Sequence, residues 1–133
     1  DVGYGVSLQI PILFQALLSE NFTHNKETLL IEQPEVHLHP SLQSKFIDTL
    51  LSIGNKNQYI IETHSEHIIR KLQVLIKNKE HNLRPEDVTI HYFTRTDKKF
   101  EITDHFIDQN GKLSPNFPPG FYDNTYQLVK ALM

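Results

Sequence analysis

Thr28-Leu-Leu-Ile-Glu-Gln-Pro-Glu-Val-His-Leu-His-Pro40 is the stretch of this sequence that decides the fold. Its first residues, Thr28–Ile31, suit a buried β-strand, because three apolar side chains follow one another. The strand runs directly into Glu32, which is followed by Gln33 and, two residues later, by Glu35. Ligands of open α/β sheets bind in the crevice beyond the carboxyl ends of the strands. We therefore expect the chemistry of the protein at this end of the strand.

A second strand and two helices follow this stretch. Gln58–Glu62 is short and ends in a polar residue, as the first strand does. Between the strands, Pro40 suits a first helical position and Gly54 a helix end, and apolar residues recur at helical spacing: Leu42, Phe46, Leu50, Leu51 and Ile53. Thr63 and Glu66 have the spacing of a capping box for the next helix. Strand–helix–strand–helix of these lengths predicts parallel strands whose polar ends share one edge.

The first residues predict a glycine-containing loop before a helix. Gly3 and Gly5 lie within Asp1–Ser7, and Ser7 suits a helix N-cap. Pro11 then falls at the fourth helical position, or the helix begins at Pro11 itself. The buried side of this helix is predicted from its apolar spacing: Val6, Ile10, Leu13, Leu17 and Leu18. The start of such a helix suits a phosphate oxygen, but a glycine turn before a core helix explains the same residues.

The C-terminal part predicts a β-hairpin. Val88–Phe93 and Lys99–Ile107 are strand-like and are separated by a polar connection. A short helix is expected from about Asp123. The sequence thus divides into a core over residues 1–87 and a hairpin with a helix over residues 88–133.

Several further residues are expected to be structural. His91 and His105 lie in strand-like stretches and suit surface or cross-strand positions. Glu62 is interpreted as a polar residue at a strand end. The aromatic side chains around Pro118 and Pro119 are expected to anchor the core: Phe117, Phe121 and Tyr122.

Composition restricts the class of protein. The 133 residues carry a formal net charge of −3, so a strongly basic nucleic-acid binder is not indicated, and DNA contact would need a local basic patch. The group to test first is Lys77, Lys79, Arg84, Arg95, Lys98 and Lys99. The lack of cysteine fits a reducing cytoplasm, and no apolar run approaches the roughly 18 residues of a membrane span. The chain starts at Asp1 rather than Met, and we expect it to be a fragment of a longer protein.

Three segments occur in the order and roughly the spacing seen in ATP-binding-cassette type ATPases. Val2–Ser7 resembles the signature loop, Leu29–Pro40 resembles the Walker B strand with the D-loop, and Ile61–Ser65 resembles the switch-histidine loop. The likeness is greatest to the bacterial branch that is similar to the overcoming-lysogenisation-defect and SMC-like proteins. The tail, with Asp108–Lys112 and Phe117–Asp123, resembles a small C-terminal domain of unknown function found on such ATPases. The resemblance implies an α/β, P-loop type fold with a parallel sheet and flanking helices.

The resemblance also implies roles for individual residues. Glu32 matches the Walker B carboxylate that holds Mg²⁺, a hard cation that prefers oxygen ligands. His64 matches the switch histidine that contacts the γ-phosphate of ATP. Gly3, Gly5 and Ser7 match family residues that contact the nucleotide bound to the opposite subunit. Leu38 and His39 match the D-loop, which crosses between the subunits.

Gln33 departs from the family pattern, which has a general-base glutamate at this position. A carboxamide takes no proton from water at neutral pH. Three explanations follow: Glu35 takes that role, Gln33 only orients the water, or hydrolysis is slow.

The phosphate-binding pattern G-x-x-x-x-G-K-[ST] occurs nowhere in the 133 residues. This chain alone is therefore expected to be inactive, and the resemblance implies a missing N-terminal half with the Walker A loop as its partner. It further implies a homodimeric, ATP-driven switch, with DNA or a nuclease as a candidate partner and phage defence as a setting.

Two other functions compete with this interpretation. A zinc-dependent or dinuclear hydrolase would use imidazole and carboxylate ligands, for which the sequence offers His37, His39, His64, His67 and Glu35. A degenerate ATPase fold that serves as an interaction module would explain Gln33 as a sign of lost hydrolysis.

Overall fold

The fold is that of a computed structural model, which describes residues 2–95, 99–118, 121 and 130–131. The chain forms two compact units, Asp1–Leu75 and Ile76–Met133. The first contains α1 (Val2–Phe22), β1 (Thr28–Glu32), α2 (Pro40–Ser52), β2 (Gln58–Glu62) and most of α3 (Glu66–Asn78). The second contains the short 3₁₀ helices η1 (Glu80–Asn82) and η2 (Pro85–Asp87), and the strands β3 (Thr89–Arg95), β4 (Phe100–Ile107) and β5 (Leu113–Ser114). The α/β class predicted from the sequence is confirmed.

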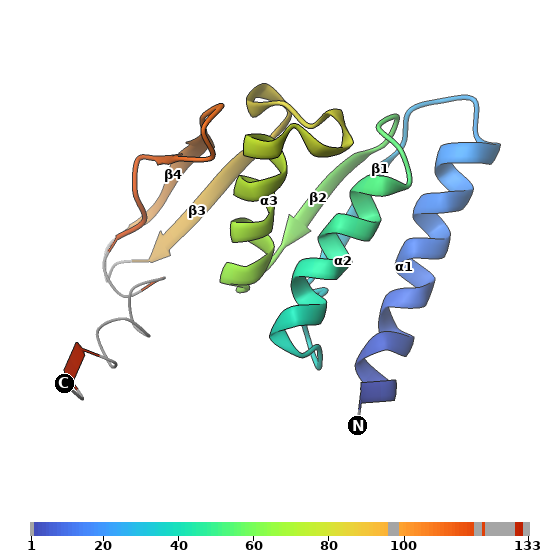
Figure 1. Cartoon of the computed structure of the whole chain (residues 1–133), viewed down its shortest axis with the longest axis horizontal. Coiled ribbons are helices and arrows are strands. Elements are labelled where there is room, and N and C mark those ends of the chain that lie inside the picture. The colour runs from blue at the N-terminus through green and yellow to red at the C-terminus, as the bar shows by residue number, and fades with distance from the viewer. Residues whose placement is uncertain (1, 96–98, 119–120, 122–129, 132–133) are drawn as a thin grey trace. The chain divides into compact units, whose positions relative to one another are not determined.

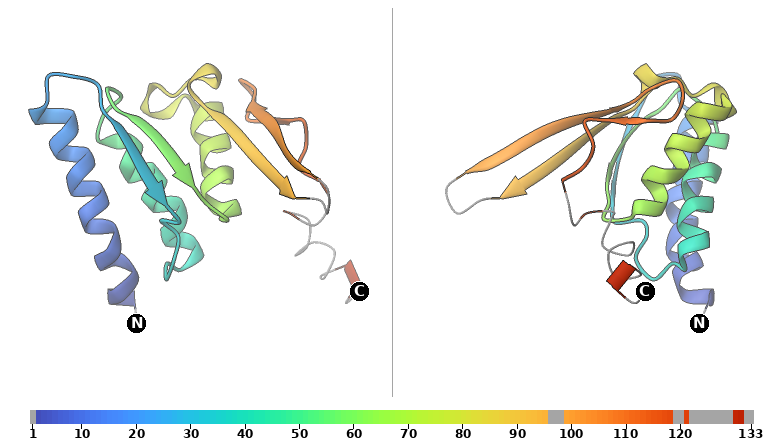
Figure 2. Two further views of the ribbon diagram at one scale, coloured as in Figure 1. Left: turned by 180° about the vertical axis from the view of Figure 1, so that it is seen from behind. Right: turned by 60° about the vertical axis from the view of Figure 1, so that its left-hand side comes forward.

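The first unit is built on a two-stranded parallel sheet. β1 pairs with β2 without a shift, from Thr28 opposite Gln58 to Glu32 opposite Glu62. Helices α1 and α2 lie side by side on one face of this sheet, as the front and back views show (Figures 1 and 2). The predicted parallel pairing is therefore confirmed, and the two strands end at the same edge.

The sheet is apolar on both faces, although the helices cover only one. Ile31 is 5% exposed and packs with the α2 residues Phe46, Ile47 and Leu50 in the core. On the opposite face, Leu30 is 74% exposed and Ile60 is 54% exposed. Successive side chains of a strand point to opposite faces, so the neighbours Leu30 and Ile31 differ in exposure. Within the first unit, no described residue covers this second face.

The predicted N-terminal loop is wrong, because α1 begins at Val2 and includes Gly3, Gly5 and Ser7. Ser7 is consequently not the N-cap. Pro11 lies well inside the helix, where its missing N–H removes one hydrogen bond of the helical ladder.

The predicted buried side of α1 is only partly right: Leu13 packs against the core and Leu18 is half-buried, but the other three side chains are exposed. Side chains expected inside are exposed: Val6 at 41%, Ile10 at 61% and Leu17 at 45%. The buried positions are Gly5, Gln9, Ala16 and Ser19. These side chains are mostly small, and a helix with a small-residue side can approach its neighbours closely. Close approach through small residues, together with the core contacts of Ile12 and Leu13, thus sets the face that α1 buries.

Polar contacts fix the end of α1 against the turn before β2. The Ser19 hydroxyl donates to Asn57 Oδ1 at 2.8 Å, and the backbone N–H of Lys56 donates to the Glu20 carboxylate at 3.2 Å. Both Ser19 and Asn57 are buried, so these hydrogen bonds satisfy groups that water does not reach. They set where β2 starts.

Helix α2 follows the prediction, with Pro40 in its first turn and an end just before Gly54. The cap of α3 differs from the prediction. Ser65 Oγ accepts from the N–H of Ile68 at 3.3 Å, and Thr63 Oγ1 accepts from the N–H of Ser65 at 3.0 Å. The N-cap is therefore Ser65, and the capping box predicted for Thr63 and Glu66 is wrong.

The second unit contains the predicted hairpin. β3 and β4 pair antiparallel from Thr89 opposite Phe106 to Arg95 opposite Phe100, and β5 extends the sheet beyond β4. β5 was not predicted, because two residues carry no periodic pattern. The described residues Phe117 and Phe121 pack with Tyr92 and His105, as expected for core anchors. Tyr122 and the helix expected from Asp123 lie outside the described residues.

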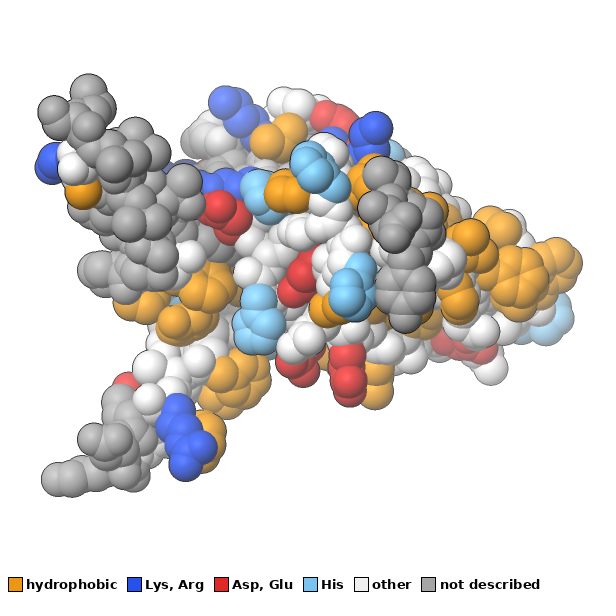
Figure 3. Space-filling view, turned by 90° about the horizontal axis from the view of Figure 1, so that it is seen from below, with side chains coloured by type: hydrophobic (Ala, Val, Ile, Leu, Met, Phe, Trp, Pro, Cys, Tyr) orange, Lys and Arg blue, Asp and Glu red, His pale blue; other side chains and the backbone are white. Residues whose placement is uncertain are grey.

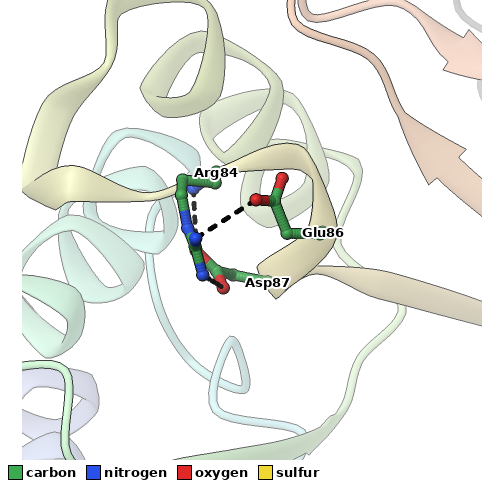
Figure 4. A network of polar contacts seen from close by, with 3 residues as sticks. All are labelled: Arg84, Glu86 and Asp87. Carbon is green, nitrogen blue, oxygen red and sulfur yellow. Dashed lines mark hydrogen bonds and ion pairs between the residues drawn. The ribbon is translucent and has the colours of Figure 1, made fainter.

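A charged cluster closes the turn before β3 (Figure 4). The Arg84 guanidinium donates to both carboxylate oxygens of Asp87, at 3.0 and 2.8 Å, and Arg84 Nη1 lies 3.2 Å from the Glu86 carboxylate. The hydrogen bonds from Arg84 lower the pKa of Asp87. The three side chains are largely exposed to solvent, and exposed ion pairs contribute little to the free energy of folding. The cluster therefore mainly orders the turn.

The helices of the described part of the chain include none with the length and apolar character that crossing a bilayer requires.

Candidate functional site

The carboxyl ends of β1 and β2 bring two carboxylates together. Glu32 and Glu62 are direct partners in the parallel register, and both are exposed. Residues paired in this way project from the same face of a sheet, and neighbouring strands lie roughly 4.8 Å apart. The sequence interpretation of Glu62 as an incidental polar residue missed this pairing. Two five-residue strands that both end in glutamate were the signal, since parallel pairing without a shift places their last residues side by side.

The chain turns sharply after Glu32. Gln33 has a φ of 42°, in the left-handed region that non-glycine residues seldom occupy, and its N–H donates to the Glu62 carbonyl at 2.8 Å. Pro34 is buried, and its carbonyl accepts from Gln9 Nε2 of α1 at 2.7 Å. A strained residue held from both sides is a recurrent feature of functional sites. The turn therefore has a fixed position relative to both β2 and α1.

Glu35 connects this turn with the segment after β2. One carboxylate oxygen accepts from Thr63 Oγ1 at 2.8 Å, and the other accepts from the backbone N–H of His64 at 2.6 Å. Hydrogen bonds to an ionised acceptor are stronger than those between neutral groups. Both oxygens of Glu35 are thus engaged, which leaves this carboxylate poorly suited to the role of a general base.

The other predicted residues of this loop occupy distinct positions. His64 is exposed, and its backbone is held by Glu35. His39 caps α2, because its Nδ1 accepts from the N–H of Ser41 at 3.3 Å. Leu38 is buried, so it packs rather than reaching outward.

Gly5 lies directly against the same loop. A Cβ atom at this position would overlap the backbone carbonyl of His37, so only glycine permits α1 to lie this close. His37 itself has a φ of 62°. The glycine segment and the segment after β1, predicted separately, are therefore in contact within one subunit.

A pocket of about 420 Å³ lies at this edge of the sheet. Its wall contains the acids Glu32 and Glu62 and the side chain of Gln33, together with residues from α1 and the turn: Leu8, Gln9, Ile12, Pro34 and Val36. Polar groups thus meet at one end of a partly apolar pocket, which is the usual character of a ligand site.

The geometry does not favour the metal-dependent hydrolase. Among the described residues, no three of the proposed ligands bring donor atoms within 4.8 Å of one another: Glu35, His37, His39, His64 and His67. Glu35 is engaged by hydrogen bonds, and His39 is a helix cap.

Two of the basic residues named for DNA contact, Arg84 and Arg95, have neighbours in the structure, and DNA binding itself stays a prediction. On the surface drawn in Figure 3, basic, acidic and imidazole side chains of the described residues are interspersed. Arg84 pairs with Asp87, and Arg95 lies over the Phe100 ring at 5.4 Å from its centre. Lys98 lies outside the described residues.

Comparison with known families gives two matches. Residues 1–69 match the family described as AAA ATPase domain, and residues 83–132 match a family described as protein of unknown function (DUF3696). No curated protein and no solved structure matches the chain. The first match covers 69 of the 133 residues and includes α1, β1, β2 and the whole pocket. The chain therefore belongs to the AAA ATPase domain family.

Proposed function

We propose that this chain is the acid-bearing part of an ATP-binding-cassette type ATPase, and that the complete protein binds and hydrolyses ATP with Mg²⁺. The observation that carries the proposal is the edge of the parallel sheet. β1 and β2 end there in the paired acids Glu32 and Glu62, and Glu35 joins the following loops through His64. Membership of the AAA ATPase domain family supports the same reaction class.

The donor set at this edge fits Mg²⁺. Glu32 provides exposed carboxylate oxygens, and hard divalent cations prefer oxygen ligands. In the proposal Glu32 holds the cation, which would neutralise charge on the phosphates during transfer.

The remaining phosphate-binding groups must come from elsewhere, because the sequence has no G-x-x-x-x-G-K-[ST] loop. We assign them to another segment of the natural protein that contains this chain. The uncovered sheet face supports this assignment, since Leu30 and Ile60 are exposed apolar residues directly beside the acidic edge. Exposed apolar side chains paired across a sheet face are consistent with contact to another segment.

The mode of action in this proposal is a homodimeric switch. Gly3, Gly5, Ser7 and His39 would contact the nucleotide held by the opposite subunit, so that ATP binding closes the dimer and hydrolysis reopens it. The similarity to the overcoming-lysogenisation-defect and SMC-like branch, a cytoplasmic setting, a DNA or nuclease partner and a role in phage defence belong to the same proposal. So does the division into a core over residues 1–87 and an appended part over residues 88–133.

The test uses the natural protein that contains this chain. Glu32→Ala should lower Mg²⁺-dependent ATP turnover by about a hundredfold or more, while Glu101→Ala on β4 should leave it unchanged. Turnover that survives Glu32→Ala would refute the assignment of this acid. A wild-type protein that binds a fluorescent ATP analogue, yet hydrolyses no ATP with or without DNA, would favour the interaction module.

A further inference from the structure

The site lacks a proton acceptor at the position where the family pattern has one. Gln33 follows Glu32 directly, and its carboxamide can donate or accept a hydrogen bond but takes no proton at neutral pH. Its backbone is held in the left-handed region by the hydrogen bond to the Glu62 carbonyl. Gln33 can therefore orient a water molecule but cannot activate it.

Glu35, the other acid after β1, is already committed. Its two carboxylate oxygens accept from Thr63 Oγ1 and from the His64 N–H, at 2.8 and 2.6 Å. Taking up a proton would weaken one of these hydrogen bonds and release the segment that carries His64. Glu35 is thus a positioning residue.

Glu62 has the properties that Gln33 and Glu35 lack. It is exposed, it is the register partner of Glu32, and it lines the same pocket as Glu32 and Gln33. Its backbone carbonyl holds the N–H of Gln33, so the three residues keep fixed relative positions. No hydrogen bond to its carboxylate is found among the described residues.

We propose that Glu62 is the proton acceptor of the hydrolysis reaction, with Gln33 orienting the attacking water. The water oxygen forms a bond to the terminal phosphorus of ATP, and its proton passes to the Glu62 carboxylate. The bond from that phosphorus to the bridging oxygen breaks, and its electron pair leaves with ADP. Glu62 then returns the proton to solvent. This inference rests on the proposed ATPase function.

The first experiment compares Glu62→Gln with the matched variant Glu27→Gln in the natural protein. Glu27 stands at the opposite end of β1, so the same chemical change is made away from the pocket. Glu62→Gln should lower kcat by about a hundredfold or more, the usual contribution of general-base catalysis, with KM for ATP little changed. Glu27→Gln should match the wild type.

A second substitution that restores activity distinguishes the loss of a proton acceptor from a structural effect of Glu62→Gln. Gln33→Glu in the Glu62→Gln background returns a carboxylate to the same pocket and should restore a large part of kcat. Retention of full turnover by Glu62→Gln would overturn the inference, and if Glu32→Gln abolishes turnover at the same time, the proposed function still stands. A wild-type protein without turnover would instead remove both.

A measurement independent of turnover tests the division of roles. Binding of Mn²⁺, followed by electron paramagnetic resonance, should be weakened by Glu32→Gln and unchanged by Glu62→Gln. Loss of Mn²⁺ binding in Glu62→Gln would make Glu62 a cation ligand and would overturn its assignment as proton acceptor.

Discussion

The Glu35 carboxylate accepts a hydrogen bond from the backbone N–H of His64, 29 residues away in sequence, at 2.6 Å. With the bond from Thr63 Oγ1, this contact joins the segments that follow the two parallel strands. The Glu35 carboxylate therefore holds the segment that carries His64 next to the turn that follows Glu32.

Removal of this carboxylate should destabilise the first unit. Glu35→Ala leaves the Thr63 hydroxyl and the His64 N–H without their acceptor, and hydrogen bonds to charged groups contribute about 1.5–3 kcal/mol. We expect the free energy of unfolding, measured with urea, to fall by about 1–3 kcal/mol. Glu101→Ala, on the exposed side of β4, should change it by less than about 0.5 kcal/mol. Equal effects of both substitutions would contradict the role of Glu35.

Gly5 should resist replacement even by alanine. Alanine stabilises a helix by about 1 kcal/mol relative to glycine, but its Cβ here would overlap the His37 carbonyl, a backbone atom that cannot turn away. Gly5→Ala should therefore lower the free energy of unfolding by about 1–3 kcal/mol. Gly54→Ala is a milder comparison, because its Cβ would meet the side chain of Glu20, which can turn away by giving up its hydrogen bonds from Lys56, whereas the His37 carbonyl cannot. If Gly5→Ala were stabilising in thermal unfolding, the close contact would be refuted.

The two faces of β1 should respond differently to truncation. Ile31→Ala removes a core side chain that is 5% exposed and should cost about 2–5 kcal/mol of unfolding free energy. Leu30→Ala, at a position 74% exposed, should cost less than about 0.5 kcal/mol in this chain. In the natural protein Leu30→Ala should cost more, because we propose that another segment covers that face. If Leu30→Ala lowers the free energy of unfolding by the same small amount in this chain and in the natural protein, no segment covers that face.

The turn before β3 should weaken in acid. Arg84 holds the pKa of Asp87 below its ordinary value of 3.8 by hydrogen bonding. Because the folded pKa is depressed, the stabilisation is present above the ordinary value and is lost as pH falls through the folded pKa. NMR titration of the Asp87 carboxyl should show this low pKa, and Arg84→Gln should return it toward 3.8. An identical pKa with and without the guanidinium would show that the cluster in Figure 4 does not form in solution.

Much of the first unit was predictable because its signals are local. The apolar run of β1, the proline at the start of α2 and the glycine after it define a strand and a helix without help from distant residues. The buried side of α1 was predicted only in part, for a tertiary reason. Its buried positions are Gly5, Gln9, Ala16 and Ser19, which no hydrophobic pattern marks, and they are buried because the helix packs closely on its neighbours.

The sequence by itself determined the α/β class, the parallel order of β1 and β2, and the edge at which the acids stand, since short-range periodicity and turn residues govern these features. Only the tertiary structure decided that Glu62 stands beside Glu32 and that Glu35 binds Thr63 and His64. The reason is that strand register and side-chain hydrogen bonds depend on how segments about 30 residues apart pack in space, which no local pattern specifies.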